Sequence, residues 1–369
     1  MATIYDLVIV GGGPAGLAAA IEAQMAGLSV VLLDRSRPPI DRACGEGIMP
    51  DGIERLRSLG VEPPAEGSSP FRGIRYIDGD TVAEGLFPDV VGYGIRRTHL
   101  HQALVDRAEA VGVELRWDTE ATGLLDDQIQ TSEGPVYGRF LVGADGRHSR
   151  MRKWAGLDRG PAPGARFGIR RHFAIKPWTD LVEVYWADGC EAYVTPVGPA
   201  TVGVAILWHK QATSFDQLLG LFPRLESQLK GAPVSSADRG AGPLENRSDG
   251  VVSNNLALLG DASGSLDAIT GEGLTLAFHQ AHALVDAILS GNLTPYVAAH
   301  SRLRREARLV TSLVLFAEAR PRLRRRMVRA LAAEPALFSR FLEILVDRLP
   351  VSSLGAGGVF RLARRLVAP

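Results

Sequence analysis

The fold is decided by residues 4–34, which read IYDLVIVGGGPAGLAAAIEAQMAGLSVVLLD. The segment begins with an apolar run at 4–10, which is typical of a buried strand. A glycine-rich turn follows, and then a helix of small residues at 14–26. A second apolar strand at 29–33 ends at Asp34. This order of strand, turn, helix and strand predicts a Rossmann-like α/β fold.

The turn carries Gly11, Gly13 and Gly16 in the pattern G-x-G-x-x-G. The first glycine makes the tight turn, the second lets the backbone approach a pyrophosphate, and the third allows close packing of helix on strand. Pro14 and Ala15 begin the helix, where unpaired N–H groups and the helix dipole favour a negative charge. The alternative is a glycine-rich turn in an unrelated α/β protein, which the flanking strands disfavour.

An acidic residue supports a dinucleotide site. Asp34 stands 18 residues after Gly16, where a carboxylate can accept hydrogen bonds from ribose hydroxyls. Arg35 follows it and is predicted to belong to the same site. This motif alone does not separate FAD from NAD.

Composition is that of an ordinary globular protein. The chain has 369 residues, 46% hydrophobic and 22% charged, which is enough for a large core in one or two domains. A formal net charge of zero argues against a nucleic-acid partner. Two cysteines, Cys44 and Cys190, make no disulfide framework, so a reducing cytoplasm is expected.

Targeting segments and metal ligands are not expected. The first strand begins at Ile4, which leaves no room for a signal peptide. The longest uncharged apolar run, residues 309–317, is about half of the roughly 18 residues that a membrane span needs. The eight histidines show no metal-ligand spacing, and His99 and His101 are expected on the surface.

Further elements follow from the patterns along the chain. Helices are predicted at 51–59 and 98–111, with a hairpin around 126–127. Residues 167–207 alternate and are rich in aromatics, which favours an antiparallel sheet. A buried strand is predicted at 251–259 and a helix at 272–289. The remainder is predicted as successive helices, broken at Pro295, Pro321, Pro335 and Pro350.

Two later segments resemble those of a known family. Residues 143–153, GADGRHSRMRK, resemble the GADGxxSxxRK segment of para-hydroxybenzoate-hydroxylase-like flavoproteins. Residues 256–274, LALLGDASGSLDAITGEGL, resemble their second FAD segment, whose aspartate binds the ribityl chain. The resemblance covers roughly residues 1–290 and implies FAD, with Asp261 on the ribityl chain and the helix from Glu272 directed at the flavin ring. The predicted FAD contacts are Gly11, Gly13, Pro14, Ala15, Gly16, Asp34, Arg35, Cys44, Gly45, Arg97, Asp145, Gly260, Asp261, Gly271, Glu272, Gly273 and Leu274.

Within that family, two details resemble the geranylgeranyl reductase branch. They are the Thr-Gly-Glu-Gly-Leu of residues 270–274 and the Cys-Gly-Glu-Gly of residues 44–47. Other positions depart from the branch, since Ala268 replaces its usual proline. Its Tyr-x-Trp-x-Phe-Pro substrate strand falls at 191–196, where Tyr193 replaces the tryptophan and only Pro196 matches.

Residues 45–50 also resemble the Gly-Glu-x-x-x-Pro of flavin-dependent halogenases. Those enzymes use a lysine on a strand shortly after this loop, but no lysine precedes Lys153 here. Their Trp-x-Trp-x-Ile-Pro signature is also missing, so we exclude halogenation.

The candidate catalytic residues are Cys44, Glu46 and Tyr193. Cys44 would lie against the flavin or substrate as a proton donor, or it is a small buried hydrophobe. Glu46 would act as an acid or base, or it is a loop residue bonded to backbone amides. Arg97 begins a helix and can reach the FAD phosphates, although Leu100 and His101 replace the Phe-Asp of the related pattern.

The predicted architecture is α/β, with a Rossmann-like FAD-binding domain, an antiparallel-sheet substrate domain and a helical C-terminal region. The FAD domain is assembled from residues 1–75, 95–160 and 245–295. Residues 76–94 and 161–244 form the substrate domain, and residues 296–369 the C-terminal helices.

Three functional hypotheses follow. The first is a monooxygenase that hydroxylates a hydrophobic or aromatic small molecule. The second is a carbon–carbon double-bond reductase like the geranylgeranyl reductases, and the third is a non-catalytic flavin-binding protein. The changed strand at 191–196 favours the first, and Cys44 and Glu272 favour the second. No second G-x-G-x-x-G is present, so NAD(P)H is expected to dock transiently as electron donor.

The C-terminal region contains an arginine-rich helix. Six arginines stand between residues 320 and 329. Such a helix can lie on an anionic membrane surface, but a solvated face or pairing with Glu318 and Glu334 is the favoured interpretation.

Overall fold

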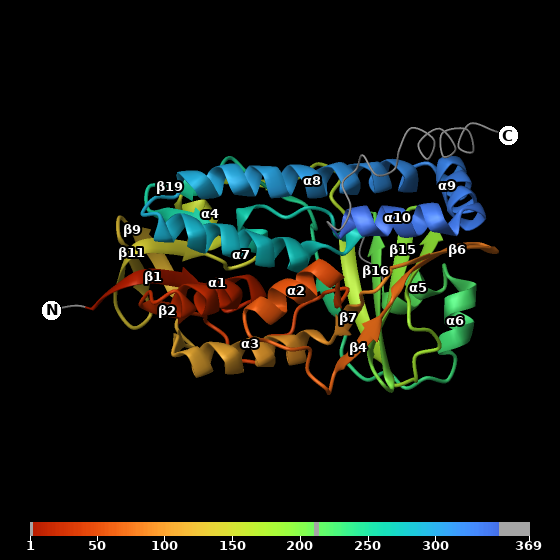
Figure 1. The fold of residues 1–369 in the computed structure, drawn as a ribbon, viewed down its shortest axis with the longest axis horizontal. Helices are drawn as coiled ribbons and strands as arrows, with labels where there is room; N and C mark the ends of the chain where they lie inside the picture. The colour runs from red at the N-terminus through yellow and green to blue at the C-terminus, as the bar shows by residue number, and fades with distance from the viewer. Residues whose placement is uncertain (1–2, 210–213, 347–369) are drawn as a thin grey trace.

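The computed structural model describes residues 3–209 and 214–346. Two sheets lie at opposite ends of an elongated molecule, with the parallel sheet near the N-terminus (Figure 1). Helices α7 and α8 run along the length between them. The predicted fold class is confirmed.

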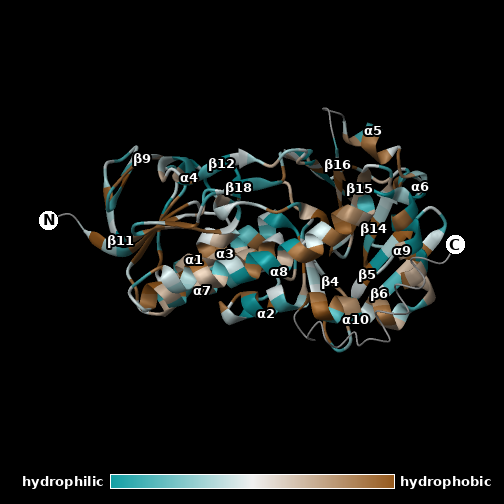
Figure 2. Ribbon diagram, turned by 90° about the horizontal axis from the view of Figure 1, so that it is seen from above, coloured by the Kyte–Doolittle hydropathy of each residue, from teal (hydrophilic) through white to brown (hydrophobic). Residues whose placement is uncertain are grey.

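The first sheet is built around β1 (Ile4–Val10), which pairs in parallel with β2 (Val30–Leu33) and β11 (Val136–Gly143). The parallel order continues through β20 (Leu256–Leu258) on one side and β8 (Glu114–Arg116) on the other. Figure 2 draws these strands largely in the brown of hydrophobic residues. Strands buried on both faces need such continuous apolar runs, and the motif at residues 11–16 follows from the end of β1.

Helices cover one face of this sheet and a hairpin covers the other. The helical face consists of α1 (Pro14–Met25), α3 (Arg97–Val111) and α7 (Gly273–Leu289), with α2 (Pro50–Ser58) packed against α7. The opposite face carries β9 (Ala121–Leu125), β10 (Gln128–Thr131) and α4 (Arg150–Trp154). Alternate residues of β1 point to each side: Leu7 and Ile9 contact the helices, and Val8 the hairpin side.

The second sheet has seven strands in the order β17-β13-β16-β15-β14-β5-β6. Their bounds are Arg239–Ala241, Phe167–Phe173, Thr201–Trp208, Cys190–Gly198, Val182–Ala187, Gly73–Asp78 and Thr81–Leu86. The strands from β13 to β16 pair antiparallel, which confirms the prediction for residues 167–207. Helices α5 (Phe215–Leu219) and α6 (Pro223–Leu229) pack on one face of this sheet. The other face of the sheet is directed toward the interior of the molecule.

Small pairings join the two sheets. A three-stranded sheet is formed by β3 (Gly47–Ile48), β7 (Gly92–Ile95) and β4 (Ser68–Phe71). A further pair consists of β12 (Asp158–Pro161) and β18 (Asn246–Ser248). The strands between residues 68 and 95 were not predicted, because they are short and their apolar residues do not alternate regularly.

The C-terminal helices begin where prolines predicted breaks. Pro295, Pro321 and Pro335 stand in the first turns of α8 (Thr294–Glu318), α9 (Pro321–Ala333) and α10 (Pro335–Leu345). Proline is tolerated there because its missing N–H has no partner within the helix. The break predicted at Pro350 lies outside the described residues.

The predicted single strand at 251–259 is wrong. The structure divides it into β19 (Val252–Ser253) and β20, which pair antiparallel around a turn at Asn254. Asn254 adopts a left-handed conformation with φ of 52°, which asparagine tolerates better than most residues. The apolar run therefore contains a hairpin.

Candidate functional site

One cavity of about 1310 Å³ joins the carboxyl ends of the parallel strands to the inner face of the second sheet. It is larger than the roughly 300–1,000 Å³ of a pocket for one drug-sized ligand. Apart from Gly16, every residue predicted to contact FAD lines it, as do Glu46 and Tyr193. The tertiary structure therefore gathers three motifs, of which the first and the last are more than 200 residues apart in sequence.

The glycine turn is shaped by two close approaches. A Cβ on Gly11, whose φ is 117°, would lie 2.3 Å from the carbonyl oxygen of Ala144. A Cβ on Gly16 would lie 2.0 Å from the Gly11 oxygen, so Gly16 serves the packing of α1 on β1. Gly13 differs, because its nearest neighbour would be Nη2 of Arg97 at 3.8 Å. The turn therefore leaves the N-terminus of α1 open to the cavity at Gly13.

Asp34 has a local role in this turn. Its Oδ2 accepts the Gly12 N–H at 2.7 Å, and its Oδ1 accepts the Ser36 N–H at 2.8 Å. Each carboxylate oxygen retains a second lone pair, and the residue lines the cavity. Its predicted contact with a ribose stays a prediction.

The prediction that His101 lies on the surface is wrong. The side chain is fully buried, with Nε2 at 2.7 Å from the Gly12 carbonyl oxygen and Nδ1 facing the Ile40 N–H. Burial lowers the pKa of His101, which favours a neutral ring that donates from Nε2. His101 therefore stabilises the glycine turn through its hydrogen bond to the Gly12 carbonyl oxygen.

Arg97 places a half-buried positive charge in the cavity. Its Nε has no hydrogen-bond partner among the described residues, and burial lowers its pKa. A buried guanidinium nitrogen without a partner is costly unless an acceptor such as an anion joins it. Together with the open N-terminus of α1, Arg97 fits a diphosphate group such as that of FAD.

The two later motifs are bound to each other. Asp145 accepts hydrogen bonds from the Arg150 and Met151 N–H groups at 2.7 and 3.1 Å, so it stabilises the start of α4. Buried Arg152 on that helix donates to the carbonyl oxygens of Asp261 and Ala262. The Asp261 carboxylate itself is half-exposed in the cavity and lies 3.4 Å from Arg147.

The last motif places the N-terminus of α7 at the cavity. Gly271 adopts a left-handed conformation with φ of 71°, and Glu272 caps the helix. The Oε2 atom of Glu272 is buried without a partner among the described residues, and burial raises the pKa of this carboxyl to about 8. A 17-residue helix with its positive end here fits the electron-rich edge of a flavin ring.

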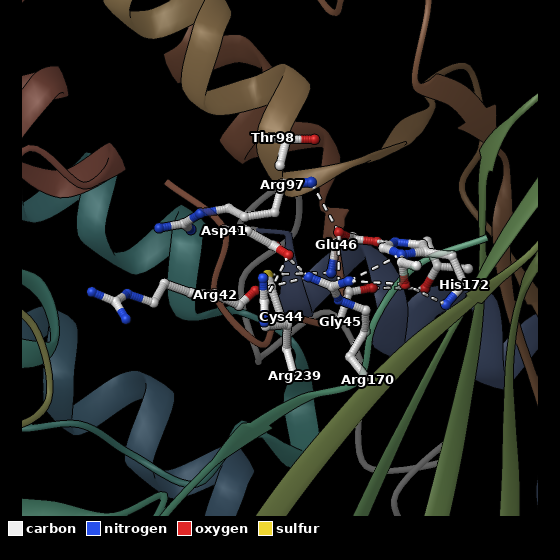
Figure 3. A network of polar contacts seen from close by, with 12 residues as sticks. Asp41, Arg42, Cys44, Gly45, Glu46, Arg97, Thr98, Arg170, His172 and Arg239 are labelled. Carbon is white, nitrogen blue, oxygen red and sulfur yellow. Dashed lines mark hydrogen bonds and ion pairs between the residues drawn. The ribbon is translucent and has the colours of Figure 1, made fainter. Parts of the chain in front are cut away.

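Glu46 is the centre of a buried polar network (Figure 3). Its Oε1 accepts a hydrogen bond from the backbone N–H of Arg97 at 2.9 Å, and its Oε2 lies 2.6 Å from Nε2 of His172. Nδ1 of His172 lies 3.0 Å from Nη1 of Arg170, which can only donate, so Nδ1 accepts and Nε2 donates to Glu46. Arg170 is also paired with Asp41. Both carboxylate oxygens of Glu46 therefore already have hydrogen-bond partners. This favours the interpretation of Glu46 as a loop residue with a structural role over acid–base catalysis.

Cys44 and Tyr193 both line the cavity but differ in their contacts. The Sγ atom of Cys44 accepts the Glu46 N–H at 3.3 Å, and burial raises the pKa of the thiol. Cys44 is therefore a neutral thiol near pH 7. The Tyr193 hydroxyl donates to the Ile269 carbonyl oxygen, and burial raises its pKa well above the ordinary value. These contacts favour Tyr193 as a positioning residue for the 260–273 loop.

Sequence reasoning missed a buried ion-pair cluster beneath that loop. Arg166 makes two hydrogen bonds to Asp267, at 2.6 and 3.0 Å, and one to Glu191 at 2.7 Å. All three side chains are buried. Arg166 belongs to none of the motifs, and no local pattern distinguishes it from a surface arginine. The cluster ties the loop to the second sheet.

Replacing Arg166 by methionine is expected to lower the free energy of unfolding by about 3–5 kcal/mol, because Asp267 and Glu191 would lose their buried counter-charge. Chemical denaturation measures the change. The matched control is Arg72→Met, which removes the pair with Asp180, where both side chains are more than half exposed. That variant should lose about 0–1 kcal/mol. Equal losses in the two variants would contradict the role of the cluster.

Part of the cavity wall is apolar. Ile74, Val182, Val184 and Leu207 line it from the second sheet, and Val310, Val314 and Leu345 from α8 and α10. We call this part, with Phe71, the apolar chamber. An apolar lining of this kind suits a hydrocarbon.

Comparison with known proteins supports the assignment of the motifs. The model of the family described as FAD binding domain matches residues 5–188. A digeranylgeranylglycerophospholipid reductase of Methanosarcina acetivorans is 28% identical over 322 residues, covering 80% of this chain and 78% of that protein. A menaquinone reductase of Mycolicibacterium smegmatis is 26% identical over 334 residues, covering 83% and 81%. A solved flavin-dependent brominase superposes with a TM-score of 0.77 at 19% identity, covering 94% of this chain and 100% of that chain; this likeness shows the fold.

Proposed function

Because this chain is an FAD-dependent oxidoreductase of the para-hydroxybenzoate-hydroxylase-like family, we propose that it reduces carbon–carbon double bonds in the isoprenoid chain of a lipid. The observation that carries the proposal is the position of Cys44. This partly buried, neutral thiol lines the same cavity as the residues that fit the flavin and the residues of the apolar chamber. An alkene lying there would meet a proton donor and a hydride donor together.

The residues present divide the reaction between them. Gly13, Arg97 and the N-terminus of α7 would hold FAD, which supplies a hydride once it is reduced. The alkene carbon that does not receive the hydride needs a proton, and the Cys44 thiol can donate it. Water then reprotonates the thiolate, so one double bond consumes one hydride and one proton.

The relatives support the class of substrate. Two of them are named as reductases of a digeranylgeranyl lipid and of menaquinone, and both of these carry isoprenoid chains. The strand at 191–196 differs from the geranylgeranyl reductase pattern, but Tyr193 and Thr195 still face the cavity. We therefore infer a similar reaction with a differently shaped end of the chamber.

The monooxygenase hypothesis stays a prediction, and the changed strand at 191–196 is the observation that favours it. NAD(P)H as the electron donor is likewise a proposal, for the reductase and for the monooxygenase. The names of the menaquinone and lipid reductases do not state which electron donor those enzymes use.

Anaerobic reoxidation separates the two reactions. The protein-bound flavin is first reduced without oxygen, and a geranylgeranyl lipid is then added while the flavin absorbance is recorded. We expect reoxidation with loss of one double bond per flavin, measured by mass spectrometry. A flavin that stays reduced until oxygen is admitted, with oxygen then incorporated into an aromatic product, would replace this proposal by the monooxygenase.

A further inference from the structure

Helix α8 has two opposite faces with different surroundings. Ala307, Thr311 and Val314 line the cavity. Leu309, Leu313 and Phe316 are turned about half a helical turn away, with exposed fractions of 62%, 62% and 52%. We call these three residues the apolar stripe. The same helix therefore forms a wall of the apolar chamber and an exposed hydrophobic surface.

The apolar stripe is bounded by positive charges. Arg302 and Arg305 precede it on the same face, and Arg320 follows it with its guanidinium 3.7 Å from the centroid of the Phe316 ring. All three arginines are exposed. Spacings of three and four residues keep the six side chains on one face of the helix.

The neighbouring helix extends this charge. Arg324 of α9 is buried and paired with Asp78 and Asp188, which fixes α9 against the second sheet. Other arginines of α9 are exposed: Arg322, Arg325, Arg326 and Arg329. Residues 294–345 contain eleven arginines and four glutamates, with no lysine or aspartate. The interpretation favoured from sequence, a solvated face or pairing with Glu318 and Glu334, stays a prediction for the exposed arginines. Arg324 is paired with Asp78 and Asp188 instead.

We propose that the apolar stripe of α8, with the arginines around it and on α9, docks the protein on an anionic lipid bilayer. Leucine and phenylalanine enter the boundary between headgroups and acyl chains, and arginines bind lipid phosphates while their stems follow the apolar surface. The excess of positive charge selects an anionic surface over a neutral one. Among residues 3–209 and 214–346, none of the helices combines the length and the hydrophobicity of a membrane span.

The inference deepens the proposed function. A lipid with an isoprenoid chain resides in a bilayer, and the helix that contacts the bilayer also lines the chamber. Docking would therefore bring the chamber beside its substrate. Membrane binding itself requires no turnover, so it can be tested separately from the reaction.

Vesicle flotation tests the proposal with the full-length protein loaded with FAD. The protein is mixed with vesicles of equal parts phosphatidylglycerol and phosphatidylcholine, or with phosphatidylcholine alone. We expect binding to the first and at least about tenfold weaker binding to the second, and about 1 M salt should weaken it because it screens exposed charges. The variant Leu309→Ser/Leu313→Ser/Phe316→Ser should bind the anionic vesicles at least about tenfold more weakly.

The control variant is Leu125→Ser/Val234→Ser/Leu289→Ser, which removes three hydrophobic side chains of 55%, 55% and 50% exposure on other elements. It should bind like the unaltered protein. Failure of the unaltered protein to float, or equal binding by the stripe variant, would overturn the proposal. A stripe that instead holds two copies together, seen as a dimer by light scattering that the variant abolishes, would also overturn it. If the unaltered protein reduces an alkene dispersed in detergent but does not bind vesicles, the proposed reaction stands and only the docking proposal is overturned.

Discussion

The Gly13→Val variant is expected to lose FAD binding altogether. The unaltered protein should be yellow and release FAD, not FMN, on heating. Valine at position 13 would place two methyl groups where the pyrophosphate must approach the backbone. The protein itself has room for the change, since only Arg97 Nη2 lies within 4 Å of the added Cβ. The variant should therefore fold and stay colourless.

The measurement is the ratio of flavin to protein absorbance after incubation with excess FAD. Gly220→Val is the matched control, because Gly220 ends α5, has an ordinary φ of −58° and would make only normal contacts. That variant should bind FAD fully. A yellow Gly13→Val protein, or unaltered protein that excess FAD cannot make yellow, would refute the assignment of the glycine turn.

Replacing Cys44 by serine is expected to slow anaerobic reoxidation by an alkene by about 10²–10⁴-fold, with FAD content near normal. Serine preserves the size and the acceptor for the Glu46 N–H, but its hydroxyl is a far weaker acid than a thiol. Stopped-flow absorbance gives the rate of reoxidation. The slow step should show a solvent isotope effect in the unaltered protein, as expected when a proton moves with the hydride.

Cys190→Ser is the control for this experiment. Cys190 is buried in the core beneath the second sheet with Val194 and Phe215, and it does not line the cavity. The variant should lose stability and keep its rate per bound flavin. If Cys44→Ser instead keeps its rate and only lowers the melting temperature, Cys44 is a packing residue and another group supplies the proton.

The sequence by itself determined the cofactor and the layout of its motifs. Gly13 and Gly16 are readable because their roles are local: each depends on the backbone of the same turn. The same holds for Asp145, whose carboxylate binds N–H groups five and six residues later. The prolines that begin α8, α9 and α10 act through their own missing N–H, so they too could be placed without the fold.

Only the tertiary structure decided which polar side chains hold the site together. His172 reaches Glu46 across 126 residues, and Arg166 reaches Asp267 across 101. Such pairs leave no periodic signal in the sequence, because the burial and the partner of each side chain depend on how the second sheet packs against the loops that carry Glu46 and Asp267. For the same reason Glu46 could be read from sequence as an acid or base, whereas its two engaged oxygens favour a structural role. The exposed apolar stripe of α8 was equally hidden, since its residues continue the chamber-lining pattern in sequence and only the fold separates the two faces.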